Sequence, residues 1–208
     1  DYNEKIRTYL MSNIDTFEYE FRLVYLNDCL LGERNIRTRS TNDIEEILQD
    51  ASLLPDYGPK KQNCKSSRQE KEKIVVVNMF NTIQTIFPSL PLPELEIGTF
   101  TVDLANRIHQ IICAGLVDKP GSFRRSEAKP AGEDFAYLSY GEIPREIKRF
   151  FENTRREIVG CTGKPRSQKI EKLIKIGSQF LNTFLYIHPY SNGNGRTARI
   201  LVSYLMSS

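Results

Sequence analysis

The sequence lacks several features that would each point to a particular class of protein. No apolar run approaches the roughly 18–20 residues that a membrane-spanning helix needs. The first residues, Asp-Tyr-Asn-Glu-Lys, do not show the basic and then apolar pattern of a secretory signal peptide. No internal repeat is visible. We therefore expect a cytoplasmic protein that has no membrane partner.

Metal-binding and disulfide patterns are also missing. The four cysteines, Cys29, Cys64, Cys113 and Cys161, are scattered and form no C-x-x-C or Cys/His ligand spacing. We expect structural or free thiols and a reducing compartment.

A strong charge of one sign is absent as well. The chain has 29 basic and 26 acidic residues among 208, which gives a net charge of +3. This balance argues against nucleic acid or an anionic membrane as the main partner. The 39% hydrophobic content is enough for a folded core, and the length suits one domain with an extension.

Apolar residues recur at three- and four-residue steps through most of the chain, which predicts a mostly α-helical protein. The segment 117–140 interrupts this pattern with turn-forming residues such as Pro120 and Gly121. A small β-hairpin is expected there, around Ser122–Ala128. Helices are predicted over 1–31, from Thr41 or Asn42 to Leu48, and over 69–87, 100–115, 144–158, 167–187 and the residues after the turn at 188–195.

The most informative stretch is Ile187–Arg199, which reads IHPYSNGNGRTAR. Its glycines permit close approach of the backbone to a ligand, and N–H groups at the start of the following helix can hold phosphate oxygens. Arg196 and Arg199, three residues apart, share one helix face and can bind further phosphates. His188 can exchange a proton near neutral pH. Together these residues predict chemistry on a phosphate.

This stretch resembles the signature of the Fic (filamentation-induced-by-cAMP) family, His-Pro-Phe-x-(Asp/Glu)-Gly-Asn-Gly-Arg-x-x-Arg. Tyr190 stands where the family has phenylalanine. The resemblance implies a Fic-type helical bundle with a small β-hairpin flap, which usually transfers AMP from ATP to a Ser, Thr or Tyr hydroxyl of a target protein. The matching residues are His188, Pro189, Gly193, Asn194, Gly195, Arg196 and Arg199.

The resemblance also implies a role for each matching residue. His188 would be the general base that deprotonates the target hydroxyl. Asn194 and the backbone of Gly193 and Gly195 would form the anion hole. Arg196 would bind near the β-phosphate and Arg199 would hold the γ-phosphate. By position, Phe123 and Arg124 resemble the family's flap, which docks the target.

Asn192 departs from the family pattern, since an acidic residue that binds Mg²⁺ usually stands there. An amide oxygen can ligate Mg²⁺ but brings no charge. Two interpretations stay open: Mg²⁺ is held mainly by the phosphates of ATP and activity is reduced, or the reaction is lost or changed. We favour the weakened metal site.

Many family members carry an inhibitory helix with the pattern (Ser/Thr)-x-x-x-Glu-(Gly/Asn), whose glutamate pairs with the second arginine of the motif. Thr16 and Glu20 match its first and fifth positions, although Phe21 replaces Gly/Asn. Thr41 and Glu45 form a rival match, and we prefer Glu20.

We thus expect an N-terminal helical extension over residues 1–68, with the inhibitory helix, and a Fic-type catalytic domain over 69–208. The expected activity is protein adenylylation with ATP and Mg²⁺. Autoinhibition by the N-terminal extension is also open. A de-AMPylase is the rival enzyme, and a nucleotide-binding pseudoenzyme is the rival outside catalysis. A homodimer stays open.

Overall fold

A computed structural model describes residues 5, 14–30, 40–51, 67–89, 96–130, 132, 134–163 and 165–207. The chain divides into two compact units, Asp1–Pro93 and Glu94–Ser208. Each unit is described by itself. The sequence analysis placed residues 69–93 with the catalytic domain, and that functional boundary stays a prediction.

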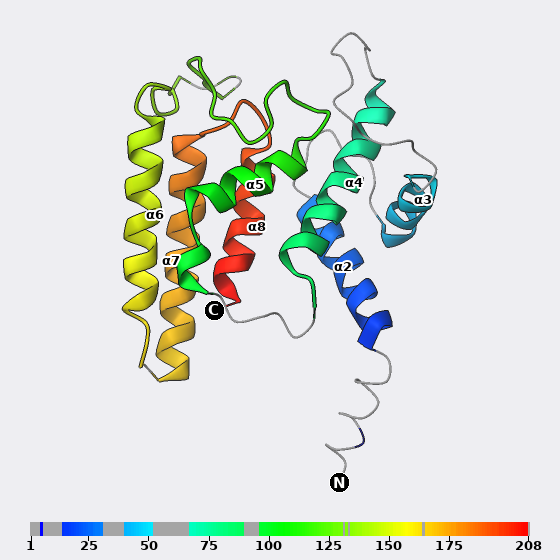
Figure 1. Cartoon of the computed structure of the whole chain (residues 1–208), viewed down its shortest axis with the longest axis horizontal. Helices are drawn as coiled ribbons and strands as arrows, with labels where there is room; N and C mark the ends of the chain where they lie inside the picture. Colours follow the sequence, from blue (N-terminus) through cyan, green and yellow to red (C-terminus); the bar gives the residue numbers. More distant parts are fainter. Residues whose placement is uncertain are drawn as a thin grey trace. The chain divides into compact units, whose positions relative to one another are not determined.

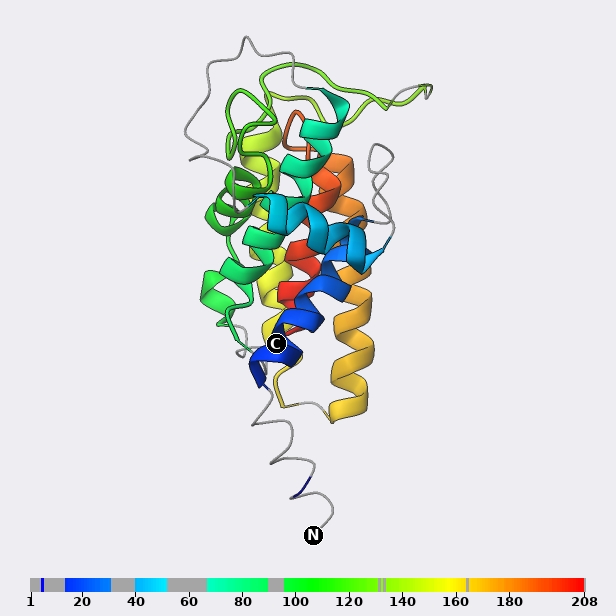
Figure 2. The ribbon, with the colours of Figure 1, turned by 90° about the vertical axis from the view of Figure 1, so that its right-hand side faces the viewer.

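Three helices make up the described part of the first unit: α2 (Ile14–Leu30), α3 (Thr41–Ala51) and α4 (Arg68–Ile86). Each of them contacts the other two (Figure 2). Their buried side chains recur at helical spacing, because one face of each helix must be removed from water. The buried apolar residues are Leu23, Leu26, Cys29, Leu30, Ile44, Val76, Met79, Ile83, Ile86 and Phe87.

Hydrogen-bonded caps begin two of these helices. Ser67 and Glu70 form a capping box, in which each side chain accepts a hydrogen bond from the backbone N–H of the other residue. Ser40 caps α3 by accepting from the N–H of Asp43 at 3.2 Å. The helix predicted to start at Thr41 or Asn42 therefore starts at Thr41, directly after its cap.

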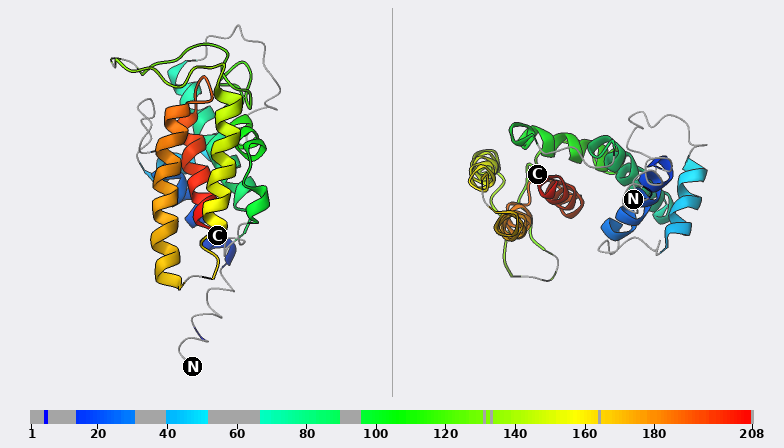
Figure 3. Two further views of the ribbon diagram at one scale, coloured as in Figure 1. Left: turned by 90° about the vertical axis from the view of Figure 1, so that its left-hand side faces the viewer. Right: turned by 90° about the horizontal axis from the view of Figure 1, so that it is seen from below.

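The second unit contains α5 (Val102–Ile112), α6 (Ile143–Val159), α7 (Arg166–Ile187) and α8 (Asn194–Met206), with a 3₁₀ turn, η1, at Ile97–Thr99. Helix α7 packs against both α6 and α8, and α5 packs against α8. Figure 1 and Figure 3 show α6, α7 and α8 side by side. The prediction of a mostly helical protein is confirmed for the described residues.

Aromatic rings fill the middle of this bundle. Phe100 lies 5.1 Å from Phe151 and 5.2 Å from Phe180, measured between ring centroids. Phe184 continues the stack at 5.8 Å from Phe180. All four side chains are buried, so this cluster joins α6 and α7 to Phe100 in the short link between η1 and α5. None of the described helices is long and apolar enough to cross a bilayer.

The predicted β-hairpin around Ser122–Ala128 was wrong, because the described residues of this loop contain no strand. Between the described residues of its two arms, one backbone hydrogen bond crosses the loop, from the N–H of Tyr137 to the carbonyl of Ala128 at 3.1 Å. Other backbone groups bond outside the loop: the N–H of Arg124 donates to the carbonyl of Pro189 at 2.9 Å. The loop thus gives its hydrogen bonds to the segment after α7 and not to a strand partner.

The connection between α7 and α8 is a tight turn that depends on Gly193. This residue precedes α8 with φ at +73°, a left-handed conformation that costs a residue with a side chain roughly 1–2 kcal/mol. A Cβ atom there would also overlap the buried sulfur of Cys113. Both the backbone and the packing therefore require glycine.

We predict that Gly193→Ala destabilises the protein by about 3 kcal/mol, from the left-handed strain and the overlap with Cys113. The double variant Gly193→Ala/Cys113→Ala removes the sulfur and should cost less than the sum of the two single variants. Chemical denaturation of all three variants measures this coupling. Additive costs would show that the sulfur does not limit position 193.

Candidate active site

The site lies at the end of the second unit where α7 stops. Seven successive backbone carbonyls, from residue 184 to residue 190, each accept a hydrogen bond. Donors are needed here because the last carbonyls of a helix have no partner within it. The donors are the N–H and Nδ1 of His188, the N–H of Leu138, the Nη2, Nε and N–H of Arg124, and the Nδ2 of Asn194.

His188 caps the C-terminus of α7 in a left-handed conformation, with φ 47° and ψ 58°. Its Nδ1 lies 3.3 Å from the carbonyl oxygen of Leu185. A carbonyl only accepts, so Nδ1 carries the proton and Nε2 carries the lone pair. The tautomer fixed in this way makes Nε2 the basic atom.

The surroundings of His188 keep it neutral. Burial lowers the pKa of its imidazole, the bond to Leu185 partly opposes this, and the charge of Arg124 lowers the pKa further. Tyr137 stacks on the ring, with the centroids 3.8 Å apart and the planes 9° from parallel. A neutral imidazole with a free Nε2 is the form that a general base requires.

Asn194 closes the turn between His188 and α8. Its Oδ1 accepts the N–H of Tyr190 at 3.0 Å, and its Nδ2 donates to the Tyr190 carbonyl at 2.8 Å. The side chain is buried and holds the backbone in place. Its backbone N–H lies at the first position of α8, where such groups can bond an anion.

Two stacked rings, those of Tyr190 and His109, pack against the turn between α7 and α8. Tyr190 stacks on His109 of α5 at 3.8 Å, and its hydroxyl donates to Oδ1 of Asn106 at 2.9 Å. Nδ1 of His109 accepts the N–H of Gly121 at 2.8 Å, so Nε2 carries the proton and donates to the Asn192 carbonyl at 3.0 Å. Burial lowers the pKa of His109 to about 4, which keeps this arrangement neutral.

Asn192 is exposed at the tip of the turn. Its Oδ1 accepts the N–H of Gly193 at 2.7 Å, which leaves one lone pair on this oxygen for a further ligand. Among the described residues no cluster of three or more His, Cys, Asp or Glu side chains could hold a metal ion. The chemistry of Asn192 therefore fits a cation only if phosphate oxygens supply the charge.

The start of α8 provides a site for an anion. No side chain caps this helix, and its N-terminal N–H groups and dipole favour negative charge. The guanidinium of Arg199 folds back over Gly195, where its Nη1 lies 3.5 Å from the position that a Cβ would take. Arg196 is buried in the same first turn. The residues present therefore fit a phosphate group.

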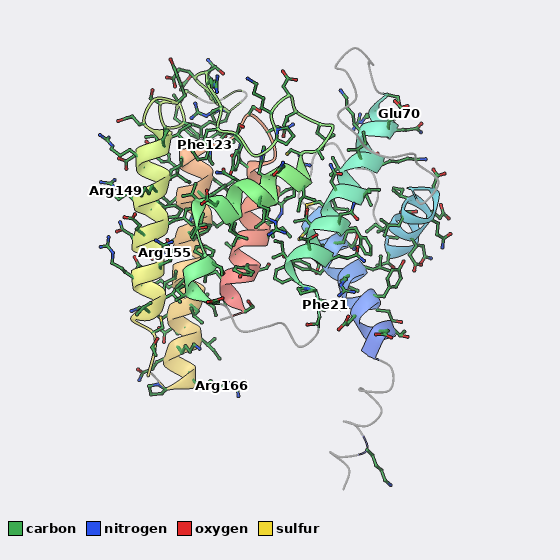
Figure 4. The ribbon with its side chains drawn as sticks, viewed as in Figure 1. Phe21, Glu70, Phe123, Arg149, Arg155 and Arg166 are labelled. Carbon is green, nitrogen blue, oxygen red and sulfur yellow. The ribbon has the colours of Figure 1, made fainter. Side chains whose placement is uncertain are left out.

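The two predicted flap residues have different surroundings. Phe123, labelled in Figure 4, is half-buried with its ring 5.8 Å from that of Tyr190. Arg124 is buried, and its guanidinium donates to backbone carbonyls that include Ser126 at 2.7 Å and His188 at 2.8 Å. This gives Arg124 a structural role. Target docking by the two residues stays a prediction.

The predicted inhibitory residues lie on α2 in the first unit. Thr16 and Glu20 are both exposed and one helical turn apart. The rival Glu45 on α3 lies near the hydroxyl of Tyr19: burial and the charge of Glu45 raise the pKa of Tyr19. Glu45 therefore already has a partner within its own unit.

Sequence reasoning missed Tyr137 and Asn106, which contact His188 and Tyr190 from distant segments. Tyr137 lies in a turn-rich stretch with no motif, so no local pattern marks it. Asn106 is a polar position on the amphipathic helix α5, where a buried hydroxyl partner is not apparent from the sequence alone.

Two solved structures have the same fold. A Fic family protein from Desulfovibrio desulfuricans G20 superimposes with a TM-score of 0.65 and 16% identity, over 98% of this chain and 54% of that chain. A Fic domain containing signaling protein from Bacteroides thetaiotaomicron VPI-5482 gives a TM-score of 0.55 and 20% identity, over 93% and 65%. This chain thus spans about half to two thirds of their length.

A short stretch matches a viral protein. Over 33 residues the chain is 48% identical to the ribonucleoside-diphosphate reductase small chain of Ostreid herpesvirus 1 (isolate France). The match covers 16% of this chain and 6% of the viral protein. It is a similarity of one segment only.

The sequence model of the Fic/DOC family matches residues 99–206, which is more than half of the chain and contains the whole site described above. The resemblance first noted in the motif after α7 therefore extends from η1 to the end of α8. The chain belongs to the Fic/DOC family.

Proposed function

We propose that the protein transfers AMP from ATP to a Ser, Thr or Tyr hydroxyl of a target protein. Members of its family commonly carry out this or a related transfer. The observation that supports the proposal most is the tautomer of His188, which leaves Nε2 as the basic atom. His188 lies in the turn that leads to the start of α8, where no side chain caps the helix. Binding of a nucleotide alone would not need a base.

In the proposed reaction, Nε2 of His188 accepts the proton of the target hydroxyl. The hydroxyl oxygen forms a bond to the α-phosphorus of ATP, the bond from phosphorus to the bridging oxygen breaks, and pyrophosphate leaves. A well-placed base of this kind contributes roughly 10²–10⁴-fold to a rate. The neutral state of His188 means that the base is ready at pH 7.

The start of α8 would hold the phosphates. Backbone N–H groups at Asn194 and Gly195 face an incoming anion, and Arg196 and Arg199 add positive charge in the same turn. Mg²⁺ bound together with ATP would neutralise part of the negative charge on the phosphates. Asn192 would add one neutral oxygen to such an ion, as a weak ligand.

Incubation with ATP labelled at the α-phosphate, in the presence of Mg²⁺, tests the proposal. We expect protein-bound label, none from ATP labelled at the γ-phosphate, and at least a 100-fold loss in His188→Ala. Circular dichroism should show that this variant keeps its helices. Equal labelling of parent and variant would exclude His188 as the base, and release of AMP from a modified protein without any transfer would favour a de-AMPylase.

Asn192→Asp should strengthen the metal site, because a carboxylate gives Mg²⁺ a charged oxygen. We expect label transfer to reach half of its maximum at a lower Mg²⁺ concentration and the rate to rise several-fold. Ser191→Asp places the same charge one exposed residue away and serves as the control. An unchanged rate and Mg²⁺ dependence in Asn192→Asp would rule out a metal role for this position.

We further propose that Thr16 and Glu20 belong to an inhibitory helix whose carboxylate competes with the γ-phosphate for Arg199. The exposure of Glu20 on α2 supports this choice, as does the interaction of its rival Glu45 with the nearby Tyr19. A carboxylate can occupy a guanidinium that otherwise binds phosphate oxygens.

Glu20→Gly should therefore raise the labelling of the protein or its target, by about tenfold or more if the carboxylate contributes the 1.5–3 kcal/mol of a charged hydrogen bond. Glu46→Gly, on an exposed position of α3, controls for loss of charge and for glycine in a helix. Activation in Glu45→Gly but not in Glu20→Gly would transfer the inhibitory role to the rival residue.

A further inference from the structure

We propose that Arg124 and Tyr137 are positioning residues, which together clamp His188 in the orientation that the transfer reaction needs. The inference rests on the proposed function for its meaning in catalysis, but its geometry does not. Arg124 binds the main chain of His188, and Tyr137 lies against its ring. Both belong to the loop between α5 and α6.

The main chain of His188 needs such support. Its φ of 47° is rare for a residue with a side chain and costs roughly 1–2 kcal/mol. Arg124 donates from Nε to the His188 carbonyl at 2.8 Å and from its backbone N–H to the Pro189 carbonyl at 2.9 Å. Two bonds from one residue thus fix the peptide groups on both sides of Pro189, the first of which is the His188–Pro189 peptide itself.

The guanidinium of Arg124 is itself held rigidly. Nη1 donates to the Ser126 carbonyl at 2.7 Å, and Nη2 donates to the carbonyls of Leu138 and Ile187. The side chain is 2% exposed, and its bonds to Ile187 and His188 place its positive charge at the C-terminal end of α7, where the helix dipole favours a cation. A planar group with several fixed donors suits this place better than an ammonium group.

Tyr137 fixes the ring. Its stacking at 3.8 Å covers one face of the imidazole, while the bond from Nδ1 to the Leu185 carbonyl sets the rotation of the ring. Tyr137 is held by its own N–H, which donates to Ala128. The next residue, Leu138, donates from its N–H to the Tyr186 carbonyl at 3.3 Å, so the loop is tied to α7 directly beside the stack.

The clamp also sets the protonation of His188. Among the described residues, the charged or titratable groups that face it are Arg124 and Tyr137 from the loop, with Glu127 4.0 Å from the Arg124 guanidinium. Helix α7 contributes the neutral Leu185 carbonyl, and Arg196 of α8 acts on His109. Removal of the Tyr137 ring should let water reach the imidazole, which raises the pKa of His188.

Nuclear magnetic resonance can test this directly, because the chain contains only two histidines, His109 and His188. Titration of their ring signals in the full chain, assigned with His188→Ala, compares the parent with Tyr137→Ala and Tyr137→Phe. We expect the His188 titration to move to higher pH in Tyr137→Ala and to stay in place in Tyr137→Phe, which keeps the ring. This measurement does not depend on any activity.

Label transfer from ATP provides the catalytic part of the test. In Tyr137→Ala we expect the acid limb of the pH profile to move to higher pH, the same direction as the titration. We also expect kcat to fall roughly tenfold, part of the 10²–10⁴-fold that a base supplies, with the KM for ATP unchanged. Tyr137→Phe should behave as the parent.

Arg124→Lys tests the other half of the clamp and keeps the positive charge. We expect lower kcat at unchanged KM for ATP, with the His188 ring signal broadened or split as its main chain gains freedom. If this variant fails to fold, the Tyr137 pair still decides the matter. Identical His188 titrations in the parent, Tyr137→Ala and Tyr137→Phe would overturn the clamp. A shifted titration in a protein that transfers no AMP would instead keep the clamp and overturn the proposed function.

Discussion

The constraint on which the site depends is the supply of donors to the carbonyls that end α7. A helix leaves its last carbonyls without partners, and burying them unpaired costs roughly 1–3 kcal/mol each. Here His188 itself supplies two of those donors, and a loop from a distant part of the sequence supplies the others through Leu138 and Arg124. Arg124 also bonds the next two carbonyls, those of His188 and Pro189. The same bonds that complete the helix therefore fix the position of His188. The hydrogen bonds that stabilise the end of α7 thus also set the geometry of the site.

The motif from His188 to Arg199 divides into residues that build the turn and residues that can react. The side chain of Asn194 bonds to the backbone of Tyr190, and the hydroxyl of Tyr190 bonds to Asn106. The neutral ring of His109 stacks on Tyr190. The groups to which the proposed reaction assigns ligand contact are fewer: the Nε2 of His188, the start of α8 and the guanidinium of Arg199, which lies over Gly195. A motif of this kind specifies a shape as much as a set of reactive groups.

Much of this could be predicted from the sequence. Helical periodicity located the helices, and the residues from His188 to Arg199 identified the family. The loop of Ser122–Ala128 was predicted wrongly as a hairpin, because turn residues show where a chain bends but not which groups take its hydrogen bonds. The stack of Tyr137 on His188 could not be foreseen, since it depends on tertiary packing between segments without a shared pattern.

Helix α7 can also be regarded as a lever. Its 22 residues at about 1.5 Å each make a rod of about 33 Å with the imidazole mounted at the tip. A pivot of only about 2° at the far end would carry that tip by about 1 Å, a displacement that can cost an enzyme about 100-fold in rate. The packed rings of Phe151, Phe180 and Phe184 hold α7 against α6 and so resist such a rotation. Substitutions in these rings, although remote from the start of α8, would therefore displace the His188 imidazole and lower the rate.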